Sequence, residues 1–151
     1  INKLVNLKIL NLTNNNLETL STNIGKLPSL IELILQQNQL SDLPDSIREL
    51  NNLRALLLSN NKFSVIPKSI TELPNLVYLY LNNNQLSYVP DTISKLPNLA
   101  YLVLSGNKLT NIPEVIYKLN NLVNLGIGNN ELVDKPTSIE ELPNLEICYV
   151  P

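Results

Sequence analysis

Six asparagines recur at intervals of 23 residues along this chain, with no insertion or deletion between them. Each asparagine lies in the same apolar frame, L-x-x-L-x-L-x-x-N-x-L, whose central leucines alternate like the inward side chains of a half-buried strand. A period this strict predicts one structural unit that is repeated along the whole chain. The asparagines are Asn15, Asn38, Asn61, Asn84, Asn107 and Asn130.

The second half of each unit has a different pattern. In residues 43–50, 66–73, 89–96 and 112–119 the apolar residues are three and four positions apart, which predicts a helical turn. Proline opens these segments, and we expect it in the first turn, where its missing N–H costs no hydrogen bond. An acidic residue follows in three of them, where the helix dipole favours negative charge: Asp45, Asp91 and Glu114.

With these residues the chain resembles leucine-rich repeat proteins of the 23-residue type, L-x-x-L-x-L-x-x-N-x-L-x-x-[LIV]-P-x-x-I-x-x-L-x-x. The resemblance implies an α/β repeat solenoid, a curved horseshoe arc with a parallel β-sheet on its concave face and short 3-10 or α-helical turns on its convex face. We expect a single solenoid over residues 1–151. It has a partial repeat at 1–6, full repeats starting at 7, 30, 53, 76, 99 and 122, and a partial repeat at 145–151.

The six repeated asparagines are predicted to be structural. An inward-turned amide can donate to and accept from backbone groups at the bend after each strand, which a tight turn would otherwise leave without partners. A buried polar group needs its partners inside the protein, so a ligand-binding role for this row is disfavoured.

The composition argues against catalysis. The sequence has no His, and its single cysteine, Cys148, stands where the earlier repeats have a core leucine. We find no ligand set for zinc or haem, no glycine-rich phosphate loop and no calcium loop. The sequence therefore predicts a protein that is not an enzyme and has no cofactor and no metal.

Charge and hydropathy exclude two further classes of partner. The net charge is -2 and the lysines are scattered singly, which argues against nucleic acid. No apolar run is long enough to cross a membrane, which argues against membrane insertion.

The remaining candidate for a functional site is the exposed face of the predicted sheet. The third, fifth and seventh positions of each frame point away from the leucine core and form three columns. The chain has 24 charged residues, yet these columns contain only one, Glu32, and they contain four of the six tyrosines. Contiguous apolar and tyrosine side chains on one exposed face mark a protein-binding site. The predicted partner-binding residues are Ile34, Leu57, Tyr78, Tyr80, Tyr101, Val103, Gly126, Gly128 and Tyr149. The alternative is that these residues simply suit strands and stack on one another.

Two glycines lie in this set. Gly126 and Gly128 remove side chains between Val103 and Tyr149, so we expect a shallow notch there, with a backbone floor. A local requirement of the strand for twist is the alternative explanation.

The last strand, within residues 145–151, would have an open edge that can pair with another chain. We expect either self-association there or cover by further sequence. A purely structural, self-assembling repeat and a repeat segment of a larger protein both stay open as alternatives to partner binding.

The resemblance implies two settings for a protein-binding module, a bacterial secreted or surface protein that engages host molecules, or an intracellular scaffold of the Ras-suppressor type. The 25 asparagines are typical of AT-rich coding sequence and favour a bacterial or protist source. The chain starts in mid-repeat at Ile1, so its lack of a targeting segment says nothing about compartment. A secreted or surface location is favoured over a cytoplasmic one, and the identity of the partner is open.

Overall fold

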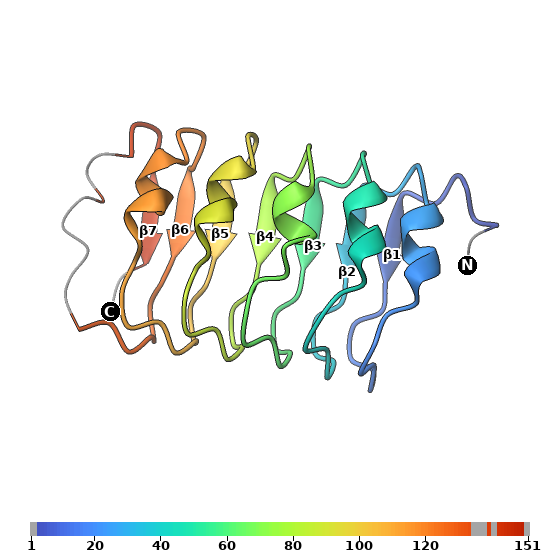
Figure 1. Cartoon of the computed structure of the whole chain (residues 1–151), viewed down its shortest axis with the longest axis horizontal. Coiled ribbons are helices and arrows are strands. Elements are labelled where there is room, and N and C mark those ends of the chain that lie inside the picture. Colours follow the sequence, from blue (N-terminus) through green and yellow to red (C-terminus); the bar gives the residue numbers. More distant parts are fainter. Residues whose placement is uncertain (1–2, 134–138, 140–141, 150–151) are drawn as a thin grey trace.

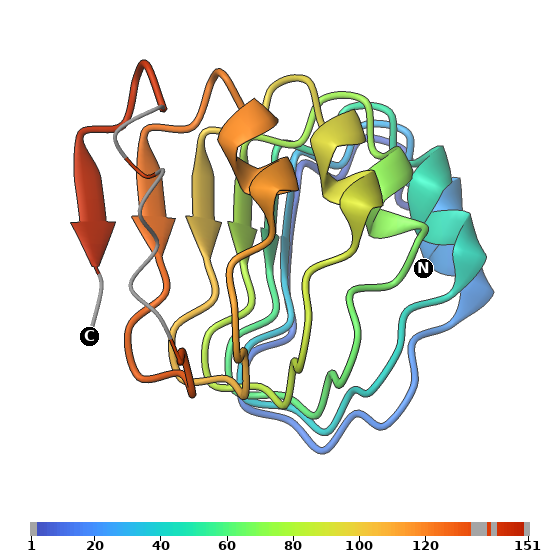
Figure 2. The same cartoon turned by 60° about the vertical axis from the view of Figure 1, so that its left-hand side comes forward.

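The computed structural model describes residues 3–133, 139 and 142–149. Short strands alternate with single 3-10 helices (η) in this part of the chain. The strands lie side by side in one layer and the 3-10 helices lie in a second layer across the core (Figures 1 and 2). The elements are β1 (Ile9–Asn11), η1 (Thr22–Lys26), β2 (Glu32–Ile34), η2 (Asp45–Glu49), β3 (Ala55–Leu57), η3 (Ile70–Glu72), β4 (Tyr78–Tyr80), η4 (Asp91–Lys95), β5 (Tyr101–Val103), η5 (Glu114–Lys118), β6 (Asn124–Gly126) and β7 (Ile147–Tyr149).

The seven strands form one parallel sheet in sequence order, β1 to β7. Each residue pairs with the residue 23 positions later, as in Leu33 with Leu56 and Leu56 with Leu79. Parallel strands are about 4.8 Å apart, whereas packed helices need about 8–10 Å, so the stack curves with the sheet on its concave side. The predicted repeat solenoid and its parallel sheet are confirmed, while the extent of a single domain over 1–151 stays a prediction.

The predicted helical turns are confirmed as 3-10 helices, but proline lies before them: by one residue in three segments, and by three residues in the fourth, where η3 begins at Ile70 after Pro67. Pro44, Pro90 and Pro113 are N-cap residues with φ near -70° and ψ near 147°, so they lie before the first turn. The carbonyl of Pro44 accepts the N–H of Ile47 at 3.0 Å, which starts the helix. Proline fits because this position needs a fixed φ and a carbonyl acceptor, and no N–H donor.

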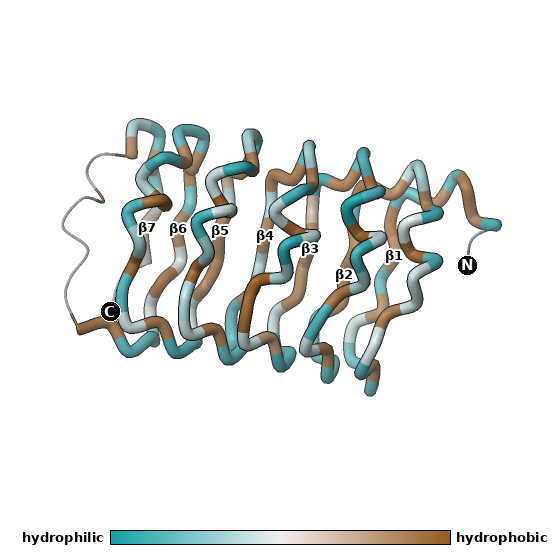
Figure 3. Tube along the Cα trace, viewed as in Figure 1, coloured by the Kyte–Doolittle hydropathy of each residue, from teal (hydrophilic) through white to brown (hydrophobic). Residues whose placement is uncertain are grey.

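The leucine frame forms the core between the two layers. Leu33, Leu56, Leu79 and Leu102, the central residues of four successive strands, are fully buried. Isoleucines of the 3-10 helices, such as Ile47 and Ile93, close the core from the other side. Hydrophilic residues gather in the loops and turns that join the layers (Figure 3). Because each repeat packs against its two neighbours, the core is continuous along the described arc.

Candidate functional site

The six asparagines that recur every 23 residues form a ladder along the solenoid. Their side-chain amides hydrogen-bond to backbone groups. Nδ2 of Asn61 donates to the carbonyl of Leu58 in its own repeat at 3.0 Å and to that of Leu35 in the preceding repeat at 2.9 Å. Its Oδ1 accepts the N–H of Leu40 at 3.0 Å. Four amides of this row are buried, namely those of Asn38, Asn61, Asn84 and Asn107. The predicted structural role is confirmed, because the donor and acceptor capacity of these amides is used inside the protein.

The two outer members of the row differ from the four buried ones. Asn15 is exposed and donates only to carbonyls of its own repeat, those of Leu12 and Thr13. Asn130 is half-buried, yet it makes the same kinds of hydrogen bond as Asn61. Its Nδ2 donates to the carbonyl of Leu104 in the preceding repeat at 3.1 Å.

The concave face carries the residues that the sequence predicted for partner binding. In the third column, the strand register places Glu32, Ala55, Tyr78 and Tyr101 on adjacent strands. In the fifth column it aligns Ile34, Leu57, Tyr80, Val103 and Gly126. The side chains of both columns between β2 and β5 are half-buried or exposed, whereas the leucine between them on each strand is buried. A contiguous apolar and aromatic surface therefore runs across four strands.

Two tyrosines of this surface are stacked. The ring centroids of Tyr78 and Tyr101 are 4.6 Å apart with 22° between the planes, and Tyr78 remains 38% exposed. Tyr80 lies on the same strand as Tyr78. Burial raises the pKa of its phenol above the ordinary value of 10.0, and Tyr101 and Tyr78 add to the shift. The phenol of Tyr80 therefore stays neutral near pH 7 and keeps an O–H donor.

A row of polar side chains borders this surface along the seventh column. Nε2 of Gln36 donates to Oγ of Ser59 at 3.5 Å, and that hydroxyl donates to Oδ1 of Asn82 at 2.5 Å. An apolar, aromatic centre with a polar rim is typical of protein–protein interfaces.

The concave face has a hollow that the sequence analysis missed. It measures about 270 Å³ and its lining is mostly apolar. Ala55 has the smallest side chain of its column, between Glu32 and Tyr78, and this was the signal in the sequence. The lining residues are Glu32, Ala55, Leu57, Tyr78 and Tyr80.

The notch predicted at Gly126 and Gly128 has no exposed backbone floor at Gly126. Gly126 is buried, and a Cβ placed on it would lie 3.0 Å from Cγ1 of Val103 and 3.1 Å from Oγ of Ser105. The side chains of Val103 on β5 and of Ser105, two residues after it, fill the space beside its backbone. Gly128 is half-buried, and Tyr149 pairs with Gly126 in the sheet, but the side chain of Tyr149 lies outside the described part of the chain.

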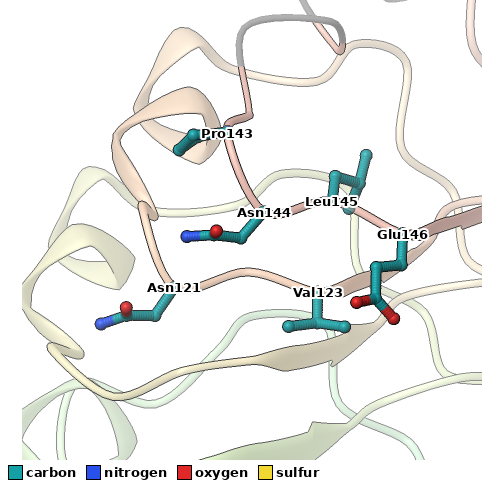
Figure 4. Close-up of a pocket in the computed structure, with 6 residues that line it drawn as sticks. All are labelled: Asn121, Val123, Pro143, Asn144, Leu145 and Glu146. Carbon is teal, nitrogen blue, oxygen red and sulfur yellow. The ribbon is translucent and has the colours of Figure 1, made fainter.

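A second asparagine row was also missed. From the repeat that starts at residue 53 onward, an asparagine stands directly before the first leucine of each frame, and Nδ2 of Asn121 donates to the carbonyl of Pro97 at 2.7 Å. Three hollows of about 300, 370 and 420 Å³ follow this row along the edge where the strands begin. Figure 4 shows Asn121 and Asn144 side by side in the largest of them. Because each amide is fixed to the preceding repeat, the row has a structural role. Its members are Asn52, Asn75, Asn98, Asn121 and Asn144.

Three further features bear on function: the single cysteine, groups that could hold a metal, and helices that could span a membrane. Cys148 is half-buried against the core, as predicted, and burial raises the pKa of its thiol. Within residues 3–133, 139 and 142–149, no group of three or more His, Cys, Asp or Glu side chains is placed to hold a metal ion. Among the helices of the same residues, none is long and apolar enough to span a bilayer.

Known proteins share this repeat and this fold. The family model described as leucine rich repeat matches residues 5–63, 28–86, 57–109 and 74–132. A leucine-rich repeat protein of Leptospira interrogans is 38% identical, with a TM-score of 0.91 over 95% of this chain and 37% of its own. The plant peptide hormone receptor RGFR1, solved in complex with RGF2, is 34% identical, with a TM-score of 0.82 over 99% of this chain and 25% of its own.

An internalin of Listeria monocytogenes shares the fold, with a TM-score of 0.81 at 24% identity over 97% of this chain and 48% of its own. No curated protein matches the sequence. The chain spans less than half the length of each of these three solved proteins.

Proposed function

Since this chain belongs to the leucine-rich repeat family, we propose that it is a non-catalytic module that binds a protein partner on the concave face of its sheet. Leucine-rich repeat modules typically bind proteins. The plant receptor similar to this chain was solved with RGF2 bound. The partner of this chain occupies the surface made by β2 to β5.

One observation supports this proposal most, the contiguous surface formed by Ile34, Leu57, Tyr78, Tyr80, Tyr101 and Val103. Exposed tyrosine offers a large contact area, few rotatable bonds and a polar tip, and it is enriched at the energetic centres of interfaces. The seven-stranded sheet is open along the whole described arc, so a loop or an extended segment fits it better than an enclosed small molecule. We therefore propose a polypeptide as the ligand.

We further propose a bacterial secreted or surface setting in which the partner is a host molecule. The similarity to the Leptospira interrogans protein and the asparagine-rich composition support this proposal. An intracellular scaffold remains the alternative, and extracts from both settings distinguish the two.

The test is affinity capture with three matched chains, the wild type, the double variant Tyr80→Ser with Tyr101→Ser, and the control Tyr88→Ser. Tyr88 is 50% exposed and lies between β4 and η4, outside the sheet. Each chain is incubated with source-cell and host-cell extracts, and retained proteins are identified by mass spectrometry. Urea unfolding of each chain checks that folding stays cooperative.

We expect a partner that the wild type and Tyr88→Ser retain and the double variant loses. Equal retention by all three chains would place binding elsewhere. If the only retained protein is the chain itself, its oligomeric state by sedimentation tests the other prediction, self-association through the edge of β7.

A further inference from the structure

The hollow over Ala55 combines the only charged residue of the concave columns with two tyrosines. Glu32 lines it from β2, Ala55 and Leu57 line it from β3, and Tyr78 and Tyr80 line it from β4. At about 270 Å³ it is smaller than the usual range of about 300–1,000 Å³ for small-molecule pockets. Its size therefore suits one side chain of a partner.

The ring of Tyr78 has one face available to this hollow. Its other face is stacked on Tyr101, the register partner on β5, at a centroid distance of 4.6 Å. Because Ala55 is the register partner on the opposite side, the second face of the ring is turned toward β3 and the hollow. An aromatic face attracts cations through the negative side of its quadrupole.

Glu32 is half-buried at the opposite wall and has no ion-pair partner within the residues that the structure describes. A half-buried carboxylate beside apolar side chains attracts a cation more strongly than one in open water, because the local dielectric is lower. The hollow thus has a negative carboxylate on one wall and the negative face of a ring on the other.

The spacing of the two walls fits a single cation between them. Two strand steps separate the backbones of Glu32 and Tyr78, which corresponds to about 9.6 Å. Because an ion pair reaches up to about 4 Å and a cation over a ring up to about 6 Å, side chains from backbones this far apart can both reach one cation. One positive group in the hollow can therefore contact both walls.

We infer that the hollow is an arginine-binding subsite that takes a guanidinium side chain of the protein partner. This inference rests on the proposed function and names the chemistry that the partner must bring. The aliphatic stem covers Ala55 and Leu57 while the guanidinium lies between the carboxylate and the ring. Arginine is preferred over lysine because its planar group both stacks on an aromatic face and bonds a carboxylate through two N–H groups.

The first experiment uses defined probes and needs no partner. Nα-acetyl-arginine amide, Nα-acetyl-lysine amide and the neutral Nα-acetyl-norleucine amide are titrated into the isotope-labelled chain, and NMR shifts of the Glu32, Ala55 and Tyr78 amides are followed. Three variants accompany the wild type. Glu32→Gln removes the charge, Ala55→Leu fills the hollow, and Glu18→Gln removes an exposed carboxylate outside the strands as a control.

We expect the arginine probe to bind more tightly than the norleucine probe by about fivefold, the factor that corresponds to about 1 kcal/mol from a half-exposed cation contact. Glu32→Gln removes this advantage, Ala55→Leu abolishes the shifts, and Glu18→Gln changes neither. Norleucine binding as strong as arginine binding, or an arginine advantage that survives in Glu32→Gln, overturns the inference.

Affinity capture with Glu32→Gln separates this inference from the proposed function. Reduced retention of the partner that Tyr88→Ser retains supports the arginine subsite. If Glu32→Gln retains the partner fully while Tyr80→Ser with Tyr101→Ser loses it, the subsite is wrong and the concave face still binds the partner. If neither variant loses the partner, both the arginine subsite and partner binding on the concave face are wrong.

Discussion

Asn61 and Asn75 carry the same amide, but their positions in the repeat give them different surroundings. Asn61 is buried and bonds backbone groups of two repeats, whereas Asn75 is exposed and donates to the carbonyl of Asn51. A buried group left without a partner costs about 1–3 kcal/mol, whereas an exposed one bonds water instead. Burial therefore decides how strongly each asparagine contributes to stability.

Asn61→Ala is expected to lower the free energy of unfolding by about 3 kcal/mol, because the N–H of Leu40 and the carbonyls of Leu35 and Leu58 lose a buried partner. Asn15→Ala is the matched control and should cost less than about 1 kcal/mol, since Asn15 is exposed. Urea unfolding of both variants measures the difference. Equal losses would mean that burial of the ladder contributes nothing.

Tyr80→Phe is expected to reduce the loss of stability at high pH. Burial raises the pKa of the folded phenol above 10.0, so the unfolded chain releases this proton first as the pH rises. The folded state is then disfavoured increasingly from about pH 10 upward, until its own phenol ionises. Urea midpoints of the wild type and Tyr80→Phe, measured between neutral pH and pH 11, should diverge above about pH 10. Parallel curves would argue against a raised pKa.

At the residue scale, the sequence predicted the ladder because the asparagine sits at a fixed place in the frame. It did not predict the hollow over Ala55, because that depends on which neighbours on β2 and β4 leave space. The sequence did not show that Gly126 is buried, for the same reason. Val103 lies across that space, and a strand pattern does not give the direction in which a neighbouring side chain leans.

Among the elements, one turn residue after each of the strands β1 to β6 repeats a left-handed conformation. Asn14, Gln37, Asn60, Asn83 and Asn129 have φ between 53° and 58°, and Gly106 takes their place in the fifth repeat with φ of 70°. Apart from Gln37, these residues are asparagine and glycine, which tolerate this left-handed region best. The turn therefore explains part of the asparagine content that the ladder alone leaves unexplained.

Gly106→Ala is expected to cost about 1–2 kcal/mol, because alanine disfavours a left-handed backbone. Gly106→Asn is the matched control, since it adds the same Cβ near the side chain of Asn83 but tolerates the conformation better. Thermal unfolding should place Gly106→Asn above Gly106→Ala. The same melting temperature for both would assign the cost to the Cβ contact and not to the backbone.

The elements themselves could be predicted from the apolar spacing and were found where the period placed them. The position of proline could not be, because the sequence does not say whether a residue starts a helix or caps it. Pro44 caps η2 with an extended ψ of 146°. Proline fixes φ but not ψ. Its presence therefore does not distinguish the N-cap position from the first helical turn.

At the scale of the whole molecule, each repeat has only its neighbours to pack against. Leu56 of β3 is fully buried between β2 and β4, whereas Leu10 of β1, at the same place in the frame, is half-buried and pairs with β2 alone. Stability of such a stack is close to a sum of repeat and interface contributions. The same substitution therefore has a larger cost in the middle of this chain.

Leu56→Ala is expected to lower the free energy of unfolding by about 3 kcal/mol or more, because it leaves a cavity between two repeats. Leu10→Ala should lower it by about 1 kcal/mol, since less apolar surface loses its contacts there. Chemical denaturation of the two variants gives both values. A Leu10→Ala loss as large as that of Leu56→Ala would contradict a nearest-neighbour stack.

Site-specific photo-crosslinking shows whether the tyrosine surface of β4 and β5 contacts the partner. A benzophenone amino acid replaces Tyr80 in one chain and Tyr88 in another, and each is irradiated in the extract that yields the partner. We predict a crosslink to the partner from position 80 and none from position 88. A crosslink from position 88 with none from position 80 would contradict the proposed binding surface.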